Sequence, residues 1–191
     1  MIEVQDLRKH FIGKRGTPPV RAVDGVSWRA HDARITGLLG PNGAGKTTTL
    51  RMLAGLLPPD AGTLHIDGID VAAQPLQARA RLGVLSDARG LYPRLSAREN
   101  IVYYGRLQGL TAAAANDRAN TLAAQLGLQE LMERRTDGFS QGERMKTALA
   151  RALVHDPSHI ILDEPTNGLD VVARKQSVSS DRSDTKLGAE E

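Results

Sequence analysis

Residues 40–48, GPNGAGKTT, combine glycines, a lysine and threonines at a spacing that suits polyphosphate binding. They match G-x-x-x-x-G-K-[ST], in which glycines let successive backbone N–H groups face one concavity and a helix that begins there adds its positive end. Lys46 is expected to reach the β- and γ-phosphates, and the Thr47 hydroxyl to ligate Mg²⁺. A glycine-rich turn without ligand is the weaker alternative, because the flanking residues predict the strand and helix that the motif requires. The residues expected to line the phosphates are Gly40, Pro41, Asn42, Gly43, Ala44, Gly45, Lys46, Thr47 and Thr48.

A second candidate site lies at the end of HIILDE, residues 159–164. A parallel strand beside the one that leads into the phosphate loop would bring Asp163 to Mg²⁺, usually through a water, and Glu164 towards the γ-phosphate, where it could polarise the attacking water. Alone, two acids after an apolar run fit a solvated strand end about equally well. The phosphate loop upstream favours the catalytic interpretation. His159 is expected to be a strand-edge residue rather than a ligand.

Regular elements are predicted around both sites. Residues 35–40, ITGLLG, suit a buried strand that stops at glycine. Apolar residues at helical spacing follow Lys46 and stop at Pro58. Residues 62–71, GTLHIDGIDV, show a strand pattern followed by a glycine turn, and residues 96–135 are rich in Ala, Leu, Gln and Arg, which predicts helices. A further helix should begin at Ser140, with Glu143 completing a capping box.

Composition limits the number of domains, the compartment and the partners that we expect. The 191 residues are 40% hydrophobic and 25% charged, which suits one globular domain with room for a subdomain. The net charge of +3 comes without a clustered Lys/Arg run, so nucleic acid is not an expected partner. The absence of cysteine fits a reducing compartment such as the cytoplasm. Since the chain contains no 18-residue apolar window, any membrane role is expected to come through a partner.

Four stretches in this order and spacing strongly resemble the nucleotide-binding subunit of ATP-binding cassette (ABC) transporters: GPNGAGKTTTLRMLAGLL, LYPRLSARENI, FSQGERMKTALARALVHDP and IILDEPTNGLD. The likeness covers roughly residues 1–173 and is nearest to exporters of the sodium-extrusion and drug-resistance branch. The order is specific, because other P-loop enzymes lack the SQGE helix start just before the second carboxylate strand. The resemblance implies an α/β fold with a mostly parallel P-loop NTPase core, an N-terminal antiparallel β portion and a helical subdomain at about 90–138.

The resemblance also implies further site residues. Phe11 stands where the family places an aromatic residue that stacks on adenine, with a core or strand-end aromatic as the alternative. Asp87 stands where the family usually has a glutamine near Mg²⁺; it keeps a metal-binding carboxylate but loses the amide donor. Asp170 matches a segment that crosses the dimer interface.

The signature stretch FSQGE implies a contact between two subunits. In the family, such a helix start contacts the γ-phosphate held by the opposite subunit, and an isolated capped helix is the alternative. Members of the family more commonly have a second glycine at the position of Gln141. The residues concerned are Ser140, Gln141, Gly142 and Glu143.

The expected function is that of an ATPase subunit, with ATP and Mg²⁺ as cofactors, that energises a membrane exporter. Two cassettes would close on two ATP molecules, and hydrolysis would reopen them. The expected partners are a second cassette and a membrane-spanning permease that docks around residues 91–106, which places the chain on the inner face of the cell membrane. The alternatives are a soluble ABC-type ATPase and a catalytically impaired nucleotide-binding remnant.

The sequence changes character after Ala173. Residues 174–191 are rich in Ser, Asp, Glu, Lys and Arg, so they are expected to be a disordered tail. In the family, a helix, a parallel strand and a histidine that contacts the γ-phosphate follow here. Their absence suggests a truncated or frame-shifted product and predicts an exposed apolar sheet edge.

Overall fold

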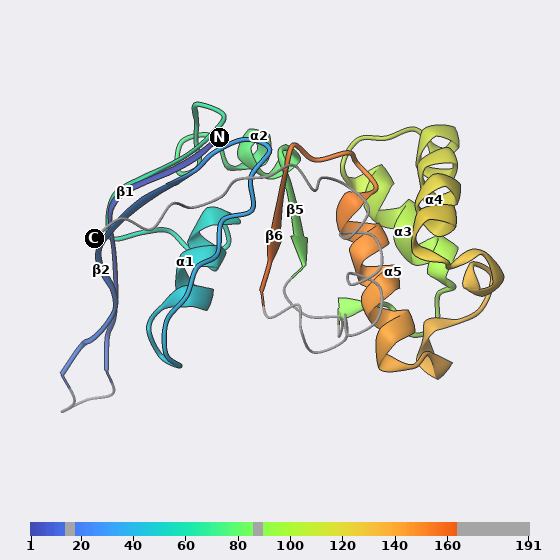
Figure 1. Ribbon diagram of the computed structural model, residues 1–191, viewed down its shortest axis with the longest axis horizontal. Helices are drawn as coiled ribbons and strands as arrows, with labels where there is room; N and C mark the ends of the chain where they lie inside the picture. Colours follow the sequence, from blue (N-terminus) through green and yellow to red (C-terminus); the bar gives the residue numbers. More distant parts are fainter. Residues whose placement is uncertain (14–17, 86–89, 164–191) are drawn as a thin grey trace, which may run out of the picture.

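The computed structural model describes residues 1–13, 18–85 and 90–163, and it contains an antiparallel sheet, a parallel strand pair and a helical region (Figure 1). The elements, in chain order, are β1 (Ile2–Phe11), β2 (Val20–Ala30), α1 (Lys46–Leu53), β3 (Ala61–Ile66), β4 (Ile69–Asp70), α2 (Pro75–Ala80), β5 (Leu82–Leu85), α3 (Ala97–Leu107), α4 (Ala112–Leu126), the 3₁₀ turns η2 (Gln129–Leu131) and η3 (Thr136–Gly138), α5 (Gln141–Leu153) and β6 (His159–Leu162).

The antiparallel sheet has the strand order β2-β1-β3-β4 and packs one face against α1. Along β1, Ile2 and Val4 are buried on one face of the strand, and Leu7 is buried beyond a register shift in the pairing with β2. Met52 and Leu53 of α1 are buried in the same core. Burying each such side chain contributes about 1.5–3 kcal/mol, so this contact fixes α1 beneath the sheet.

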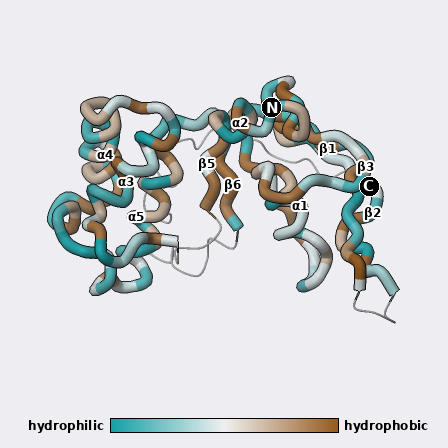
Figure 2. Tube along the Cα trace, turned by 180° about the vertical axis from the view of Figure 1, so that it is seen from behind, coloured by the Kyte–Doolittle hydropathy of each residue, from teal (hydrophilic) through white to brown (hydrophobic). Residues whose placement is uncertain are grey.

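The parallel pair consists of β5 and β6, with Leu82 opposite His159 and Leu85 opposite Leu162. Both strands are hydrophobic along most of their length (Figure 2), which is typical of parallel strands. The pair lies between α1 on one side and α5 on the other in both views (Figures 1 and 2). It therefore separates the antiparallel sheet from the helical region.

The inserted helices expected from the fold class are α3 and α4, which two 3₁₀ turns follow, and they pack on α5. The core between these helices contains several alanines on one face of α4, at positions 115, 119 and 123, all nearly fully buried. Such small side chains let α3 and α5 approach α4 closely. The α/β fold class, the N-terminal antiparallel portion and the inserted helices thus agree with expectation.

The strand predicted at 35–40 is absent. These residues carry no strand assignment, and Ile35 and Leu39 are almost fully exposed. A buried strand needs hydrogen-bonding partners along its edges, and within the described residues β6 pairs with β5 rather than with 35–40. The expectation that the Asp163 strand lies beside the one feeding the phosphate loop is therefore wrong for the described part of the chain. Helix α1 also ends at Leu53, earlier than Pro58, because Gly55 takes a left-handed conformation.

In the described residues, one edge of β6 has no strand partner, and apolar side chains of the strand are exposed. Ile160 is 50% exposed and Leu162 42% exposed, and in the described residues β6 pairs only with β5. An unpaired strand edge with apolar side chains promotes association with other chains. We expect Ile160→Lys to reduce aggregation of the purified chain, measured as light scattering at rising concentration, with Leu76→Lys, an exposed position on α2, as the control. Equal effects of both substitutions would mean that added charge, rather than the strand edge, decides solubility.

None of the helices in the described part of the chain is both long and apolar enough to cross a membrane. The predicted disordered tail, residues 174–191, lies outside the described residues. So does the end of the predicted cassette beyond Asp163.

Candidate nucleotide site

The phosphate loop leads directly into α1, as its sequence predicts. Helix α1 begins at Lys46 behind Gly45, which has φ 84 and ψ 7. The backbone N–H groups of the first helical turn have no partners within the helix, so they are available to an anion. Residues 41–44 are exposed, and Lys46, Thr47 and Thr48 are half-buried. The loop is thus open to a ligand at the positive end of a helix.

Gly43 and Gly45 share a left-handed φ of 84 but differ in the space around them. A Cβ at Gly45 would lie 2.1 Å from the carbonyl oxygen of Ala22, whereas a Cβ at Gly43 meets no atom within 4 Å. Gly45→Ala is expected to destabilise the fold by at least about 2–3 kcal/mol, since it adds backbone strain to a clash with β2. Gly43→Ala should cost only about 1 kcal/mol, from strain alone. Chemical denaturation of both variants measures this, and equal losses would contradict the role of the contact between Gly45 and Ala22.

Lys46 lies folded over the loop. Its ammonium group donates to the carbonyl oxygens of Gly40, at 2.7 Å, and Pro41, at 2.9 Å. These contacts already direct a positive charge into the concavity of the loop. A polyphosphate bound at the loop would meet this positive charge.

Thr47 and Asp163 meet although they are 116 residues apart. The Thr47 hydroxyl lies 3.5 Å from Oδ1 of Asp163, which is the residue after β6. The backbone N–H of Asp163 donates to the carbonyl oxygen of Leu85 at 2.9 Å, which continues the β5–β6 ladder and aims the carboxylate. A hydroxyl and a carboxylate oxygen are the ligand types that Mg²⁺ prefers, so these two residues fit the metal role expected of them.

Four further site residues were predicted from the sequence, and the structure describes one of them. Phe11 ends β1 opposite Val20 and is 42% exposed, so its ring is accessible, as a stacking role requires. Glu164, Asp87 and Asp170 lie outside the described residues. Their proposed roles remain predictions.

Ser140 and Glu143 form the predicted capping box at the start of α5. The Ser140 hydroxyl accepts from the Glu143 N–H at 3.3 Å, and the Glu143 carboxylate accepts from the Ser140 N–H at 2.7 Å. Ser140 is exposed, and a Cβ added at Gly142 would meet no atom within 4 Å, so the helix start faces open space.

The hydrogen bonds from the backbone and side chain of Ser140 lower the pKa of Glu143. The cap is therefore strongest above the ordinary glutamate pKa of about 4.3, and it weakens as pH falls through the lowered value. We expect the melting temperature of the parent to exceed that of Glu143→Gln at pH 6 and this difference to shrink below about pH 4. A difference that stays constant from about pH 6 to about pH 3 would contradict the charged cap.

The phosphate loop and the capped start of α5, which form the two halves of the candidate site, do not lie together within one chain. The phosphate loop and α1 lie on one side of the β5–β6 pair, and α5 begins on the other side (Figure 1). Ser140 therefore cannot contact phosphates held by the loop of the same chain in this arrangement. If both motifs bind one nucleotide, a second chain must supply one of them.

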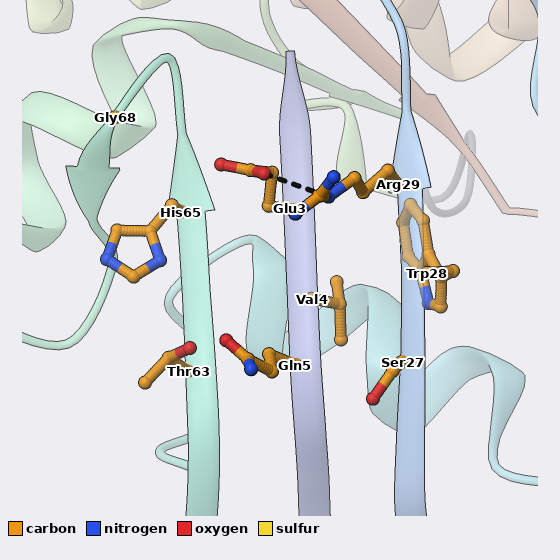
Figure 3. A pocket seen from close by; sticks show the side chains of 9 residues that line it. All are labelled: Glu3, Val4, Gln5, Ser27, Trp28, Arg29, Thr63, His65 and Gly68. Atoms are coloured by element: carbon orange, nitrogen blue, oxygen red, sulfur yellow. Dashed lines mark ion pairs between the residues drawn. The ribbon is translucent and has the colours of Figure 1, made fainter.

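A separate hollow of about 690 Å³ lies on the antiparallel sheet (Figure 3). An ion pair of 3.0 Å between Glu3 and Arg29 crosses it. It contains no residue of the phosphate loop or of the capped helix, so it does not belong to the candidate nucleotide site. Its lining residues are Glu3, Val4, Gln5, Ser27, Trp28, Arg29, Thr63, His65 and Gly68.

Sequence reasoning missed one polar cluster. His159 does lie at a strand end, but its Nε2 is 2.8 Å from Oδ1 of Asp67 and 3.3 Å from the α-nitrogen of Met1. Two sequence features hint at this cluster: a histidine in an otherwise apolar strand and an aspartate in a tight turn. Neither feature alone distinguishes a cluster from a solvated surface.

Comparisons with known proteins agree with the geometry. The ABC transporter family model matches residues 23–167. The ABC transporter ATP-binding protein NatA of Bacillus subtilis is 45% identical over 91% of this chain and 70% of its own length. The daunorubicin/doxorubicin resistance ATP-binding protein DrrA of Streptomyces peucetius is 42% identical over 92% of this chain and 51% of its own.

Further matches are also ATP-binding proteins or cassettes of transporters. The Nod factor export ATP-binding protein I of Paraburkholderia xenovorans is 44% identical over 80% of this chain and 50% of its own length, so the chain spans only about half of several curated relatives. Among solved structures, a dimeric bacterial ABC transporter cassette superimposes with a TM-score of 0.79 at 25% identity, covering 89% of this chain and 76% of that one.

Proposed function

The chain belongs to the ABC transporter family as an ATP-binding cassette of the ATP-hydrolysing type, and from this membership we propose that it energises an exporter by closing on ATP together with a second cassette. The observation that carries the proposal is the contact between Thr47 and Asp163, which joins the end of the phosphate loop to the end of the carboxylate strand.

The nucleotide roles follow from this geometry. Lys46 would bind the β- and γ-phosphates, because its ammonium already lies over the loop. The α1 N–H groups would hold phosphate oxygens, and Phe11 would stack on the base. The loop, Lys46 and the exposed ring of Phe11 together favour ATP over a smaller phosphate ligand.

A divalent cation fits between Thr47 and Asp163. Their oxygens are hard ligands, and Mg²⁺ usually combines one or two protein oxygens with water and phosphate oxygens. When bound, Mg²⁺ would neutralise charge on the phosphates. Asp87 is a further candidate ligand by sequence alone. Glu164, the residue after Asp163, is the candidate to orient the attacking water.

A second cassette is the proposed source of Ser140, Gln141, Gly142 and Glu143. In one chain the start of α5 and the phosphate loop lie on opposite sides of the β5–β6 pair (Figure 1). A head-to-tail pair related by a two-fold axis would bring each helix start to the other chain's loop, so both sites would form at once. The solved cassette with similar fold is dimeric, which supports this arrangement.

The membrane partner is proposed to dock on the helical subdomain. Tyr92 and Tyr103 are each nearly half exposed, and their rings meet edge to face at 5.7 Å. Leu107 is exposed further along α3. Exposed aromatic and aliphatic side chains of this kind suit a protein interface. The chain would then act at the inner face of the cell membrane, and export is the role named for relatives such as the Nod factor protein.

The proposal is tested by ATP binding and hydrolysis of the purified chain beside Glu164→Gln. We expect the parent to release phosphate and the variant to bind ATP with similar affinity while its rate falls at least about 100-fold, because the group that orients water is lost. Binding without turnover in both proteins would reject hydrolysis and leave a nucleotide-binding remnant. Failure of the parent to bind ATP would reject the whole proposal.

A further inference from the structure

Two buried polar side chains meet at a loop that leads into α3. Asn100 of α3 is 0% exposed, and Thr136, the first residue of η3, is 2% exposed. Both bind the backbone of Tyr92, shortly before the α3 cap at Ser96. Burying an amide or a hydroxyl costs free energy unless the group is hydrogen-bonded, so a partner shared by two such side chains marks a specific arrangement.

Asn100 binds Tyr92 through both ends of its side-chain amide. Its Oδ1 accepts from the Tyr92 N–H at 2.8 Å, and its Nδ2 donates to the Tyr92 carbonyl oxygen at 3.1 Å. The same Nδ2 donates to the carbonyl oxygen of Ser96 at 2.9 Å, so its second proton is also used. The Tyr92 loop, residues 92–95, is therefore fastened to the start of α3.

Thr136 fastens the same loop to the segment that leads into α5. Its backbone N–H donates to the carbonyl oxygen of Leu95 at 3.1 Å. The next N–H, that of Asp137, donates to the carbonyl oxygen of Pro93 at 3.1 Å. Among the described residues, no backbone bond from this segment reaches Tyr92 itself. The Thr136 hydroxyl extends the pairing to Tyr92, because it donates to the Tyr92 carbonyl oxygen at 2.9 Å.

This network ends at two surfaces with proposed functions. On one side, the Phe139 N–H donates to the Thr136 carbonyl oxygen at 3.3 Å, and Ser140, the cap of α5, comes next in the chain. On the other side, the Tyr92 ring is 46% exposed and meets the ring of Tyr103 edge to face. A short hydrogen-bonded path thus joins the helix start proposed to contact a nucleotide with the surface proposed to bind the permease.

We propose that Thr136 is a positioning residue: its hydroxyl makes the Tyr92 loop follow the start of α5, while Asn100 holds the same loop on α3. The Thr136 side chain is buried, so it acts through Tyr92 rather than on a ligand. A buried hydrogen bond is costly to break, so a displacement of the α5 start would carry the loop with it. The role in transport rests on the proposed function, because it requires a nucleotide at α5 and a partner at Tyr92.

Fluorine NMR of the full chain labelled with 3-fluorotyrosine tests this coupling without nucleotide. The chain has three tyrosines, at positions 92, 103 and 104, and Tyr92→Phe identifies the signal of Tyr92. Ser140→Ala perturbs the start of α5, because it removes the cap. We expect this change to shift the Tyr92 signal in the parent and in Thr136→Ser, which keeps the hydroxyl. In Thr136→Val, which lacks it, the shift should be at least about twofold smaller.

The choice of variants keeps the fold intact. Thr136→Val leaves the Tyr92 carbonyl bound to Asn100, whereas removal of Asn100 would leave the Tyr92 N–H without its side-chain partner. Tyr104 is the internal control, because the Arg151 guanidinium of α5 lies 4.4 Å from the centre of its ring and makes its signal a reporter of the packing between α3 and α5. Its signal should stay the same in Thr136→Val and Thr136→Ser.

A second set of spectra adds Mg²⁺ and a non-hydrolysable ATP analogue. We expect Thr136→Val to bind the analogue within about twofold of the parent affinity but to lose at least about half of the Tyr92 shift that binding causes. A parent that binds no analogue would reject the proposed function, and the spectra without nucleotide would still decide the role of Thr136. Equal Tyr92 shifts in Thr136→Val and Thr136→Ser, no shift in any background, or a Tyr104 signal that moves as much as that of Tyr92 would overturn the proposal and leave Thr136 as a local anchor of the loop.

Discussion

Replacing Lys46 by alanine is expected to lower the affinity for ATP by about 10- to 100-fold. A hydrogen bond to a charged group contributes about 1.5–3 kcal/mol, and each 1.4 kcal/mol corresponds to a factor of ten. The Lys46 ammonium lies 2.7 Å from the Gly40 carbonyl and is the charged side chain folded over the loop. Calorimetric titration with a non-hydrolysable ATP analogue measures the loss without interference from turnover.

The control for this experiment is Arg51→Ala. Arg51 is exposed in the last turn of the same helix, so its removal changes the net charge equally without touching the loop. We expect its affinity to stay within about twofold of the parent. Equal losses in both variants would show that long-range charge, rather than contact with phosphates, holds the nucleotide. An unchanged affinity in Lys46→Ala would place the nucleotide away from this loop.

Features set by neighbouring residues could be predicted from the sequence. The capping box of Ser140 and Glu143 joins residues three positions apart, so its pattern is complete in a short window. The glycine turn that leads into α1 and the helices α3 and α4 are likewise local. These elements agree with expectation because their hydrogen bonds close within a few residues.

Features that depend on pairing between distant segments could not be predicted in the same way. Residues 35–40 have the composition of a buried strand, but a strand forms only where another strand meets its hydrogen bonds. The contact between Thr47 and Asp163 was expected because the phosphate-loop motif assigned Thr47 to Mg²⁺ and an expected strand pairing brought Asp163 to the same ion, yet the described residues form the contact without that pairing. Composition gave no sign that Asp67 and His159 would meet, since each is ordinary in its own segment.

Mixing two inactive variants gives the strongest test of the shared site. Lys46→Ala removes the phosphate-loop lysine and Ser140→Ala removes the hydroxyl of the capped helix, so each homodimer carries two defective sites. A mixed dimer places both defects in one site and leaves the other intact, because each site takes its loop from one chain and its α5 helix from the other. With free exchange, about half of the dimers are mixed, and independent sites then restore about a quarter of the parent ATPase rate.

The size of this recovery separates two arrangements. If the loop and the α5 helix of one chain served the same nucleotide, mixing would restore nothing, since every chain would still carry a defect in its own site. The separation of the loop and the α5 start by the β5–β6 pair argues against that arrangement (Figure 1).

A double variant carrying both substitutions, mixed in equal amount with the parent, is the matched control. In a site built from two chains, each site of a mixed dimer has one defect, so only the parent homodimers hydrolyse ATP and about a quarter of the parent rate remains. If each chain served its own nucleotide, every parent chain would stay active and about half of the rate would remain. Two mixtures that both reach about a quarter therefore support the shared site, whereas none in the first and about half in the second would contradict it.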